Sequence, residues 1–221
     1  MAKRKDFLNQ FLASHSVPED ALEHFGANDF TNEFLSLPSY RVVPAYGRIL
    51  KESGEDYFFS RTINTPSTIP HMVTLQLKDV RTLKESDRRM LKPYQGHKEV
   101  VKPPENPDTI VLIHLARPGV DGHPSVIHGG VTCAIFDETI GSCVMLHHEA
   151  ASGARDTLFT ATLSVNFRAR TQTPNDVVVK CWLEGRQGRK WKARGLMIDR
   201  NGLVLAEAEG LWMETRESGK L

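Results

Sequence analysis

The segment from Leu158 to Arg170 constrains the fold most, because apolar and polar residues alternate along it. One side carries Ala161, Leu163, Val165, Phe167 and Ala169, and the other carries Thr160, Thr162, Ser164, Asn166, Arg168 and Arg170. A period of two over this length indicates a β-strand. Three further strand-like segments follow in close order, separated by turn residues, at 177–184, 190–199 and 203–213. Short hairpin connections predict an antiparallel sheet.

One long apolar segment precedes these strands. It runs from Val126 to Leu146 and carries Asp137 and Glu138 near its middle. Two carboxylates are costly in a lipid core, so we interpret residues 129–147 as a buried helix. Earlier strands are expected at 72–77 and 109–115. The order predicts an α+β fold, with an antiparallel sheet of about six strands wrapped around one long central helix.

The chain has 221 residues, which suits one domain with an extension. Residues 1–60 are expected to form a partly helical N-terminal extension, in which Ser16-Val-Pro-Glu19 has the pattern of a helix start. The main domain is expected at 61–215. Residues 216–221 are expected to be a C-terminal tail.

Charge and cysteine content exclude several classes of function. Lys plus Arg is 28 and Asp plus Glu is 27, so the chain has no global attraction to nucleic acid. Cys133, Cys143 and Cys181 lack the close spacing of a disulfide framework or a structural zinc site. We expect a cytoplasmic location, with mitochondria as the less favoured alternative. His147 and His148 are expected to form a polar helix end.

The first chemical candidate is the start of the long helix, His128-Gly129-Gly130. Backbone N–H groups at a helix N-terminus favour negative charge, and glycine lets a ligand approach the backbone. This arrangement could form an oxyanion hole. The alternative is an ordinary glycine-rich helix start. The second candidate is Asp137, which shares a helix face with small residues and could alternatively be an acid paired within the core.

Distance limits how these two candidates could cooperate. Gly129 and Asp137 are eight residues apart, or about 12 Å along one helix. A reacting carbonyl must lie within about 3 Å of both its oxyanion donor and its attacking group. Two antiparallel copies of the helix could supply both. The spacing therefore predicts a homodimer, or a dimer of dimers, with sites shared between chains.

The polar face of the strand 158–170 is the third candidate. Thr160 offers a hydroxyl that could position water or substrate. Asn166, Arg168 and Arg170 form an end suited to phosphate. The alternative is a solvated strand face, which is the usual role of such alternation.

At these residues the sequence resembles the hotdog-fold thioesterase superfamily, in particular its PaaI-like and thioesterase-superfamily-member branch. The core of that branch reads His-Gly-Gly, six residues, then Asp, and here it reads His128-Gly-Gly through Asp137. The strand from Thr160 to Arg168 and the closing hairpins also fit. The resemblance covers about residues 105–214, and the remainder looks like longer fungal members. Some members of the superfamily carry an Asn six residues before the His of this motif, and this chain has Gly122 at that position.

The resemblance implies hydrolysis of an acyl-CoA thioester. Asp137 would be the general base or nucleophile, the Gly129 N–H would polarise the carbonyl, and Thr160 would hold the water. His128 would shape the start of the helix. The expected contacts with substrate and coenzyme A are Gly130, Asn166, Arg168 and Arg170. No metal is expected, and no cofactor apart from the coenzyme A of the substrate.

Two other functions stay open from the sequence. A hotdog dehydratase would use a histidine with a helix carboxylate, and His123 and Glu138 could be that acid and base. The other alternative is a non-catalytic dimer that binds acyl groups.

Overall fold

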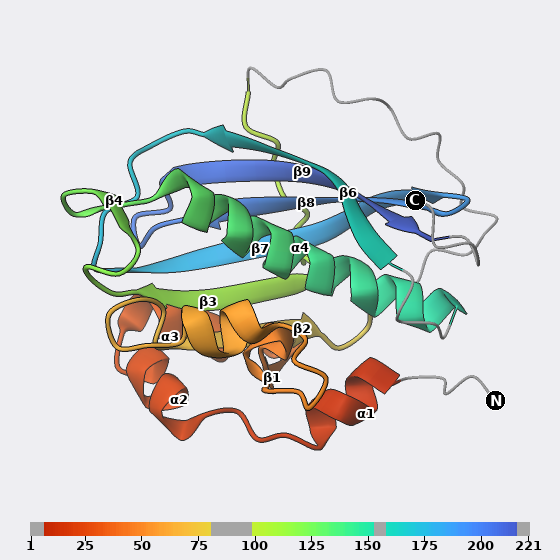
Figure 1. The fold of residues 1–221 in the computed structure, drawn as a ribbon, viewed down its shortest axis with the longest axis horizontal. Helices are drawn as coiled ribbons and strands as arrows, with labels where there is room; N and C mark the ends of the chain where they lie inside the picture. Colours follow the sequence, from red (N-terminus) through yellow and green to blue (C-terminus); the bar gives the residue numbers. More distant parts are fainter. Residues whose placement is uncertain (1–6, 81–98, 153–157, 216–221) are drawn as a thin grey trace.

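The computed structural model describes residues 7–80, 99–152 and 158–215. A seven-stranded antiparallel sheet lies against one long helix, α4 (Gly129–Ser152), as Figure 1 shows. The strands in sheet order are β1 (Tyr40–Pro44), β2 (Met72–Leu77), β3 (Thr109–Leu115), β7 (Asn175–Gln187), β8 (Lys190–Ile198), β9 (Val204–Glu214) and β6 (Leu158–Phe167). The predicted α+β fold, a sheet around one central helix, is confirmed. The expected tail at 216–221 lies outside the described residues.

All six expected strands are present, and the seventh comes from the segment expected to be an extension. Strand β1 pairs with β2 from Tyr40 opposite Leu77 to Pro44 opposite Val73. The sheet edge is therefore built by residues 40–44, although residues 1–60 were expected to form a partly helical extension and no strand was predicted there.

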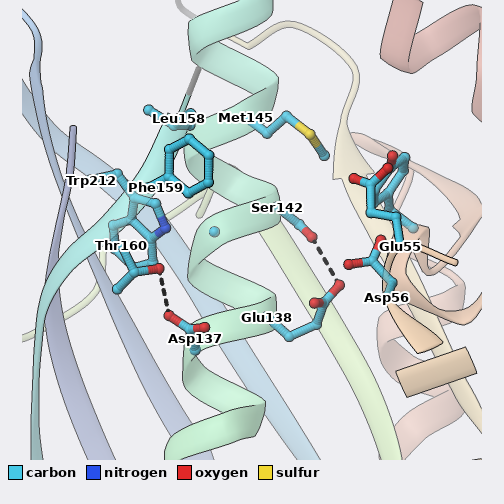
Figure 2. Close-up of a pocket in the computed structure, with 12 residues that line it drawn as sticks. Glu55, Asp56, Asp137, Glu138, Ser142, Met145, Leu158, Phe159, Thr160 and Trp212 are labelled. Carbon is cyan, nitrogen blue, oxygen red and sulfur yellow. Dashed lines mark hydrogen bonds between the residues drawn. The ribbon is translucent and has the colours of Figure 1, made fainter. Parts of the chain in front are cut away.

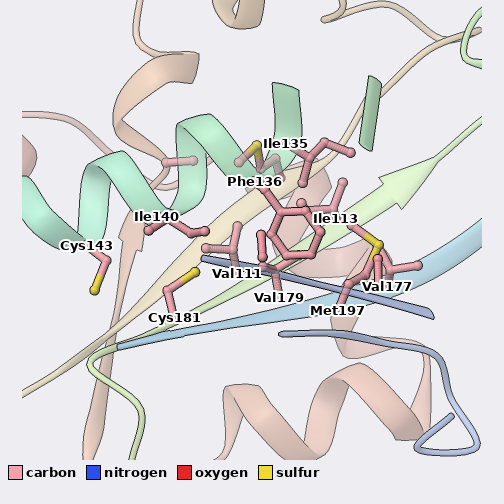
Figure 3. Packing of buried hydrophobic residues seen from close by; sticks show 14 of the residues in the cluster. Val111, Ile113, Ile135, Phe136, Ile140, Cys143, Val177, Val179, Cys181 and Met197 are labelled. Atoms are coloured by element: carbon pink, nitrogen blue, oxygen red, sulfur yellow. The ribbon is translucent and has the colours of Figure 1, made fainter. Parts of the chain in front are cut away.

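Helix α4 packs on one face of the sheet because the side it turns to the strands is mostly apolar (Figure 3). Its fully buried residues include Ile135, Phe136, Ile140, Cys143 and Val144. A Cβ atom at Gly195 of β8 would lie 2.9 Å from the Phe136 ring, so this glycine permits the close approach of helix and sheet. By length and composition alone, α4 could span a membrane, but its apolar face is used in this core.

Further helices cover the opposite face of the sheet (Figure 1). They are α2 (Glu19–Gly26) and α3 (Asp29–Leu35), and α2 buries Phe25 completely. Alternate residues of β3 serve the two cores: Val111 and Ile113 face α4, whereas Ile110 and Leu112 belong to the cluster with α2. Helix α1 (Phe7–Ala13) packs near β1 and α4.

The remaining elements are short. A 3₁₀ turn, η1 (Tyr46–Arg48), and a π-helical turn, η2 (Phe58–Thr62), lie between β1 and β2. The hairpin of β4 (Asp121–His123) and β5 (Val126–Ile127) precedes α4.

Strand β6 departs from the predicted strict alternation. Its pairing with β9 shifts between Thr160 and Thr162, so Ala161 is an extra residue at a bulge. A bulge changes which face the residues before it occupy. Thr160 therefore points toward α4, on the side where Leu163 and Val165 pack. The strand also ends at Phe167 instead of Arg170, and Phe167 is 57% exposed instead of facing the core.

The expectation of a polar helix end at His147 and His148 is wrong. Both side chains are buried. The Nε2 atom of His147 lies 2.8 Å from Asp108 Oδ2, and the Nε2 atom of His148 lies 3.3 Å from Glu214 Oε1. These partners come from other parts of the chain, which explains how imidazoles are accommodated inside.

Candidate active site

A pocket of about 250 Å³ opens beside the middle of α4. One wall is the beginning of β6, and the opposite wall is the chain that follows β1 (Figure 2). The residues that line it are Tyr46, Glu55, Asp56, Asp137, Glu138, Gly141, Ser142, Met145, Leu158, Phe159, Thr160 and Trp212. Four carboxylates and several apolar side chains thus share one small space.

Asp137 projects from α4 into this pocket and is exposed to solvent. The hydroxyl of Thr160 donates a hydrogen bond to Asp137 Oδ1 over 2.8 Å (Figure 2). Gly141, one turn further along α4, leaves the indole of Trp212 next to the helix, since a Cβ there would lie 3.4 Å from Trp212 Nε1. The structure thus brings two predicted site residues, Asp137 and Thr160, into direct contact.

The start of α4 has a different arrangement. His128 Nδ1 accepts a hydrogen bond from the Gly130 N–H over 2.9 Å, so this side chain caps the helix. Gly129 is exposed, and a Cβ placed on it would lie 3.5 Å from the Phe167 ring. The cap uses the Gly130 N–H and leaves the Gly129 N–H as the candidate oxyanion donor. Neither Gly129 nor His128 lines the Asp137 pocket, so one chain does not bring the donor to the carboxylate.

Comparison with known proteins finds one family for part of the chain. Residues 125–206, from β5 to the start of β9, match the family model of the thioesterase superfamily. Over these 82 of the 221 residues the chain is similar to that superfamily. The helix and sheet that they form have the hotdog fold.

Among the solved structures with similarity to this chain, one is described as a thioesterase superfamily protein and two were solved with CoA. A thioesterase superfamily protein is 26% identical, and the match covers 48% of this chain and 50% of that one, with a TM-score of 0.40. A Bacillus halodurans protein solved with CoA is 16% identical over 47% of this chain and 65% of its own, with a TM-score of 0.41. A Staphylococcus aureus protein in complex with CoA is 12% identical over 50% and 72%, with a TM-score of 0.43. The match thus spans half the length of the first protein.

Glu138 adjoins Asp137 in sequence but faces the other wall of the Asp137 pocket (Figure 2). Burial, together with the negative charge of Asp56, raises the pKa of Glu138 to about 7 against the opposing effect of Lys51. The Lys51 ammonium pairs with Asp56 over 2.5 Å. A Cβ at Gly47 would lie 2.2 Å from Glu138 Oε1, so the chain before β2 packs directly onto this carboxyl group.

This wall was not predicted from the sequence. Tyr46, Glu55 and Asp56 belong to a segment in which no chemistry was predicted, yet all three line the pocket. No local pattern marks them as site residues. Only the pairing of β1 with β2 brings this segment beside α4.

The expected coenzyme A contacts lie at the far end of β6, near the start of α4. The Arg168 Nε atom donates to Glu207 Oε1 over 3.0 Å, and the guanidinium makes a second contact with the same oxygen. Part of its charge is therefore neutralised within the chain. Arg170 is exposed and Asn166 is partly buried. Phe167, between these residues, is the side chain nearest to Gly129.

The structure does not unite the pair expected for a dehydratase. His123 is exposed on the β4 hairpin, whereas Glu138 lies nine residues into α4 from Gly129, in a pocket that His123 does not line. Asp121, which precedes Gly122 in the chain, accepts hydrogen bonds from Arg117 Nε over 3.0 Å and from the hydroxyl of Thr173. These hydrogen bonds, led by that of Thr173, lower the pKa of Asp121.

Proposed function

We propose that this protein hydrolyses an acyl-CoA thioester, with Asp137 as the catalytic carboxylate. The observation that supports this most directly is the hydrogen bond from Thr160 to Asp137, 2.8 Å long, inside a pocket of a thioesterase-superfamily domain. The hydrogen bond that the Thr160 hydroxyl donates to one carboxylate oxygen orients the Asp137 carboxylate. The second carboxylate oxygen stays available in the pocket (Figure 2). A carboxylate held in this way can act on a water molecule or on a carbonyl carbon.

The reaction balances with this one carboxylate. As general base, Asp137 takes a proton from water while the water oxygen bonds to the thioester carbonyl carbon. As nucleophile, its own oxygen forms that bond, and water then cleaves the resulting anhydride. In both cases the carbon–sulfur bond breaks and the coenzyme A sulfur leaves as the thiolate, which takes up a proton. The carbonyl oxygen needs a donor such as the Gly129 N–H.

We further infer that this donor comes from a second copy of the chain. Strand β6 forms one edge of the sheet, and Phe159 and Phe167 on it are 50% and 57% exposed. An edge strand presents unpaired backbone groups that can pair with another chain. The strand runs from Thr160, beside Asp137, to Phe167, beside Gly129. Antiparallel pairing of two β6 strands would thus place the Gly129 of each chain near the Asp137 of the other.

The hydrolysis is tested by thiol release from a panel of short, medium, long and aromatic acyl-CoAs. We expect Asp137→Asn to lower kcat by about 100-fold or more, the usual contribution of a positioned acid or base. Glu138→Gln is the matched control, because it neutralises the neighbouring carboxyl group of the same pocket and is expected to retain most turnover. Normal turnover by Asp137→Asn would refute the assignment. Tight acyl-CoA binding by the wild type without thiol release would instead favour an acyl-binding protein.

The shared site is tested by mixing two inactive variants. Gly129→Pro removes the N–H at the first helical position, where proline is tolerated, and Gly129→Ala is its control because it keeps the N–H. If each site combines two chains, a co-expressed equal mixture of Gly129→Pro and Asp137→Asn recovers about one quarter of wild-type activity, since half of the dimers carry one intact site. No recovery, in a mixture shown to contain heterodimers, would place both groups in one chain.

A further inference from the structure

A cluster of histidines lies on the opposite face of the sheet from the Asp137 pocket, where α2 meets the strands. The Asp176 Oδ1 atom of β7 lies 2.9 Å from His24 Nε2 of α2 and 2.7 Å from His114 Nδ1 of β3. All three potential ligand atoms lie within 4.8 Å of one another. The side chains of His24, His114 and Asp176 are 28%, 21% and 12% exposed, so solvent reaches them.

A third imidazole adjoins this cluster. The His71 ring stacks on the His24 ring, with centroids 4.7 Å apart and an interplanar angle of 23°. Its Nδ1 atom is buried and has no hydrogen-bond partner among the described residues, and Asp20 Oδ2 lies 3.6 Å away. An imidazole nitrogen buried without a partner is costly, and hydrogen bonds among the described residues do not account for it.

The carboxylate of the cluster is held in a fixed orientation by hydrogen bonds with three side chains, those of His114, His24 and Asn28. The Asn28 side chain donates to Asp176 Oδ2 over 2.8 Å, which leaves Oδ1 directed at the two histidines. In metal sites, partners of this kind orient the ligating carboxylate.

We propose that His24, His114 and Asp176 bind a divalent transition-metal cation that fastens α2 to the sheet. Two imidazole nitrogens and one carboxylate oxygen are a donor set that suits Zn²⁺ and its first-row neighbours, whereas Mg²⁺ and Ca²⁺ prefer oxygen ligands. The ion would replace the two hydrogen bonds to Oδ1, and solvent, which reaches the partly exposed cluster, would supply a further ligand. No local sequence pattern indicates this site, because its ligands are separated by 90 and 62 residues.

A second group of possible ligands, Asp108, Cys143 and His147, is less suited to an ion. Cys143 and His147 are almost fully buried. The Asp108 Oδ2 atom already accepts the Leu183 N–H over 2.7 Å and contacts His147 Nε2 over 2.8 Å. The Asp108 oxygen is therefore engaged by two groups of the core, although His147 Nδ1 has no hydrogen-bond partner among the described residues.

The test is titration of the metal-stripped, full-length protein with Zn²⁺ at pH 7.5 by calorimetry. We expect saturable binding of one equivalent per chain, which an excess of Mg²⁺ does not prevent. His24→Gln and His114→Gln are each expected to abolish this binding. His15→Gln, which changes an exposed histidine outside the cluster, is the matched control and is expected to leave binding unchanged.

Two further measurements separate ligation from a structural role. Asn28→Ala keeps all three ligands but frees the carboxylate, and is expected to weaken Zn²⁺ binding by about 10- to 100-fold. Co²⁺ bound in place of Zn²⁺ is expected to give visible absorption bands that His114→Gln removes. Absence of saturable Zn²⁺ binding by the wild type would overturn the proposal, as would binding that survives His24→Gln and His114→Gln together.

Discussion

The carboxyl group of Glu138 makes the stability of this protein depend on pH in a direction that can be tested. Burial and the neighbouring Asp56 charge raise the pKa of Glu138 from 4.5 to about 7. The unfolded chain loses this proton near pH 4.5, whereas the folded chain keeps it to near pH 7. Between these values the folded state binds more protons, so its stability falls as the pH rises. Above pH 7 the full loss is present.

The size of this effect follows from the shift. A difference of about 2.5 pKa units, from 4.5 to about 7, corresponds to roughly 3 kcal/mol at 1.36 kcal/mol per unit. The pocket is open to water, and screening reduces the effect. We therefore expect about 1–2 kcal/mol of stability to be lost between pH 5 and pH 8 through this group. Glu138→Gln keeps the shape of the side chain and removes the proton equilibrium.

Urea unfolding of wild type and Glu138→Gln at pH 5 and pH 8 measures this difference. The free energy of unfolding of Glu138→Gln minus that of wild type is expected to be about 1–2 kcal/mol larger at pH 8 than at pH 5. Glu55→Gln removes a carboxylate from the same pocket and controls for the general loss of one negative charge. If wild type and Glu138→Gln lose stability in parallel over this range, the reasoning about Glu138 is refuted.

Two other changes have defined outcomes. Gly195→Ala is expected to destabilise the protein by about 1–3 kcal/mol in urea unfolding, because its Cβ would lie 2.9 Å from the Phe136 ring. Gly26→Ala is the control and is expected to cost far less stability, because no atom lies within 4 Å of a Cβ placed there. Thr160→Val removes the hydroxyl that contacts Asp137 and is expected to lower kcat by about 10- to 100-fold, the value of a hydrogen bond to a charged group. Thr160→Ser keeps the hydroxyl and is expected to retain most of the wild-type kcat. A wild-type kcat for Thr160→Val in steady-state kinetics would exclude a positioning role for Thr160.

The main elements could be predicted because their signals are local. The alternation in β6 and the apolar face of α4 are read from neighbouring residues, and hairpin turns fix which strands pair. The bulge at Ala161 has no such signal, since it depends on the register between β6 and β9. Strict alternation placed Thr160 and Leu163 on opposite faces. The bulge instead turns Thr160 toward Asp137.

Contacts between distant segments are the part that could not be predicted. Strand β1 joins the sheet through pairing with β2, and the paired residues lie 29 to 37 residues apart in the chain. This pairing brings Tyr46 and Asp56 to the pocket. The burial of His147 and His148 also depends on partners that are distant in the sequence. His147 looks like a polar helix end in the sequence because its partner, Asp108, is 39 residues away.

The distribution of charge along β6 and α4 indicates how a thioester would be oriented. Glu55, Asp56, Asp137 and Glu138 gather at the pocket end. Lys51 offsets the charge of Asp56 and the pKa of Glu138 is raised to about 7, and the negative charge that remains would repel the phosphates of coenzyme A. The exposed Arg170 lies beyond the other end of β6. For the hydrolysis proposed above, we therefore expect the phosphates near Arg170 and the acyl group in the pocket. Because Glu55 and Asp56 belong to the chain before β2, that segment would discriminate against acyl groups that carry a negative charge.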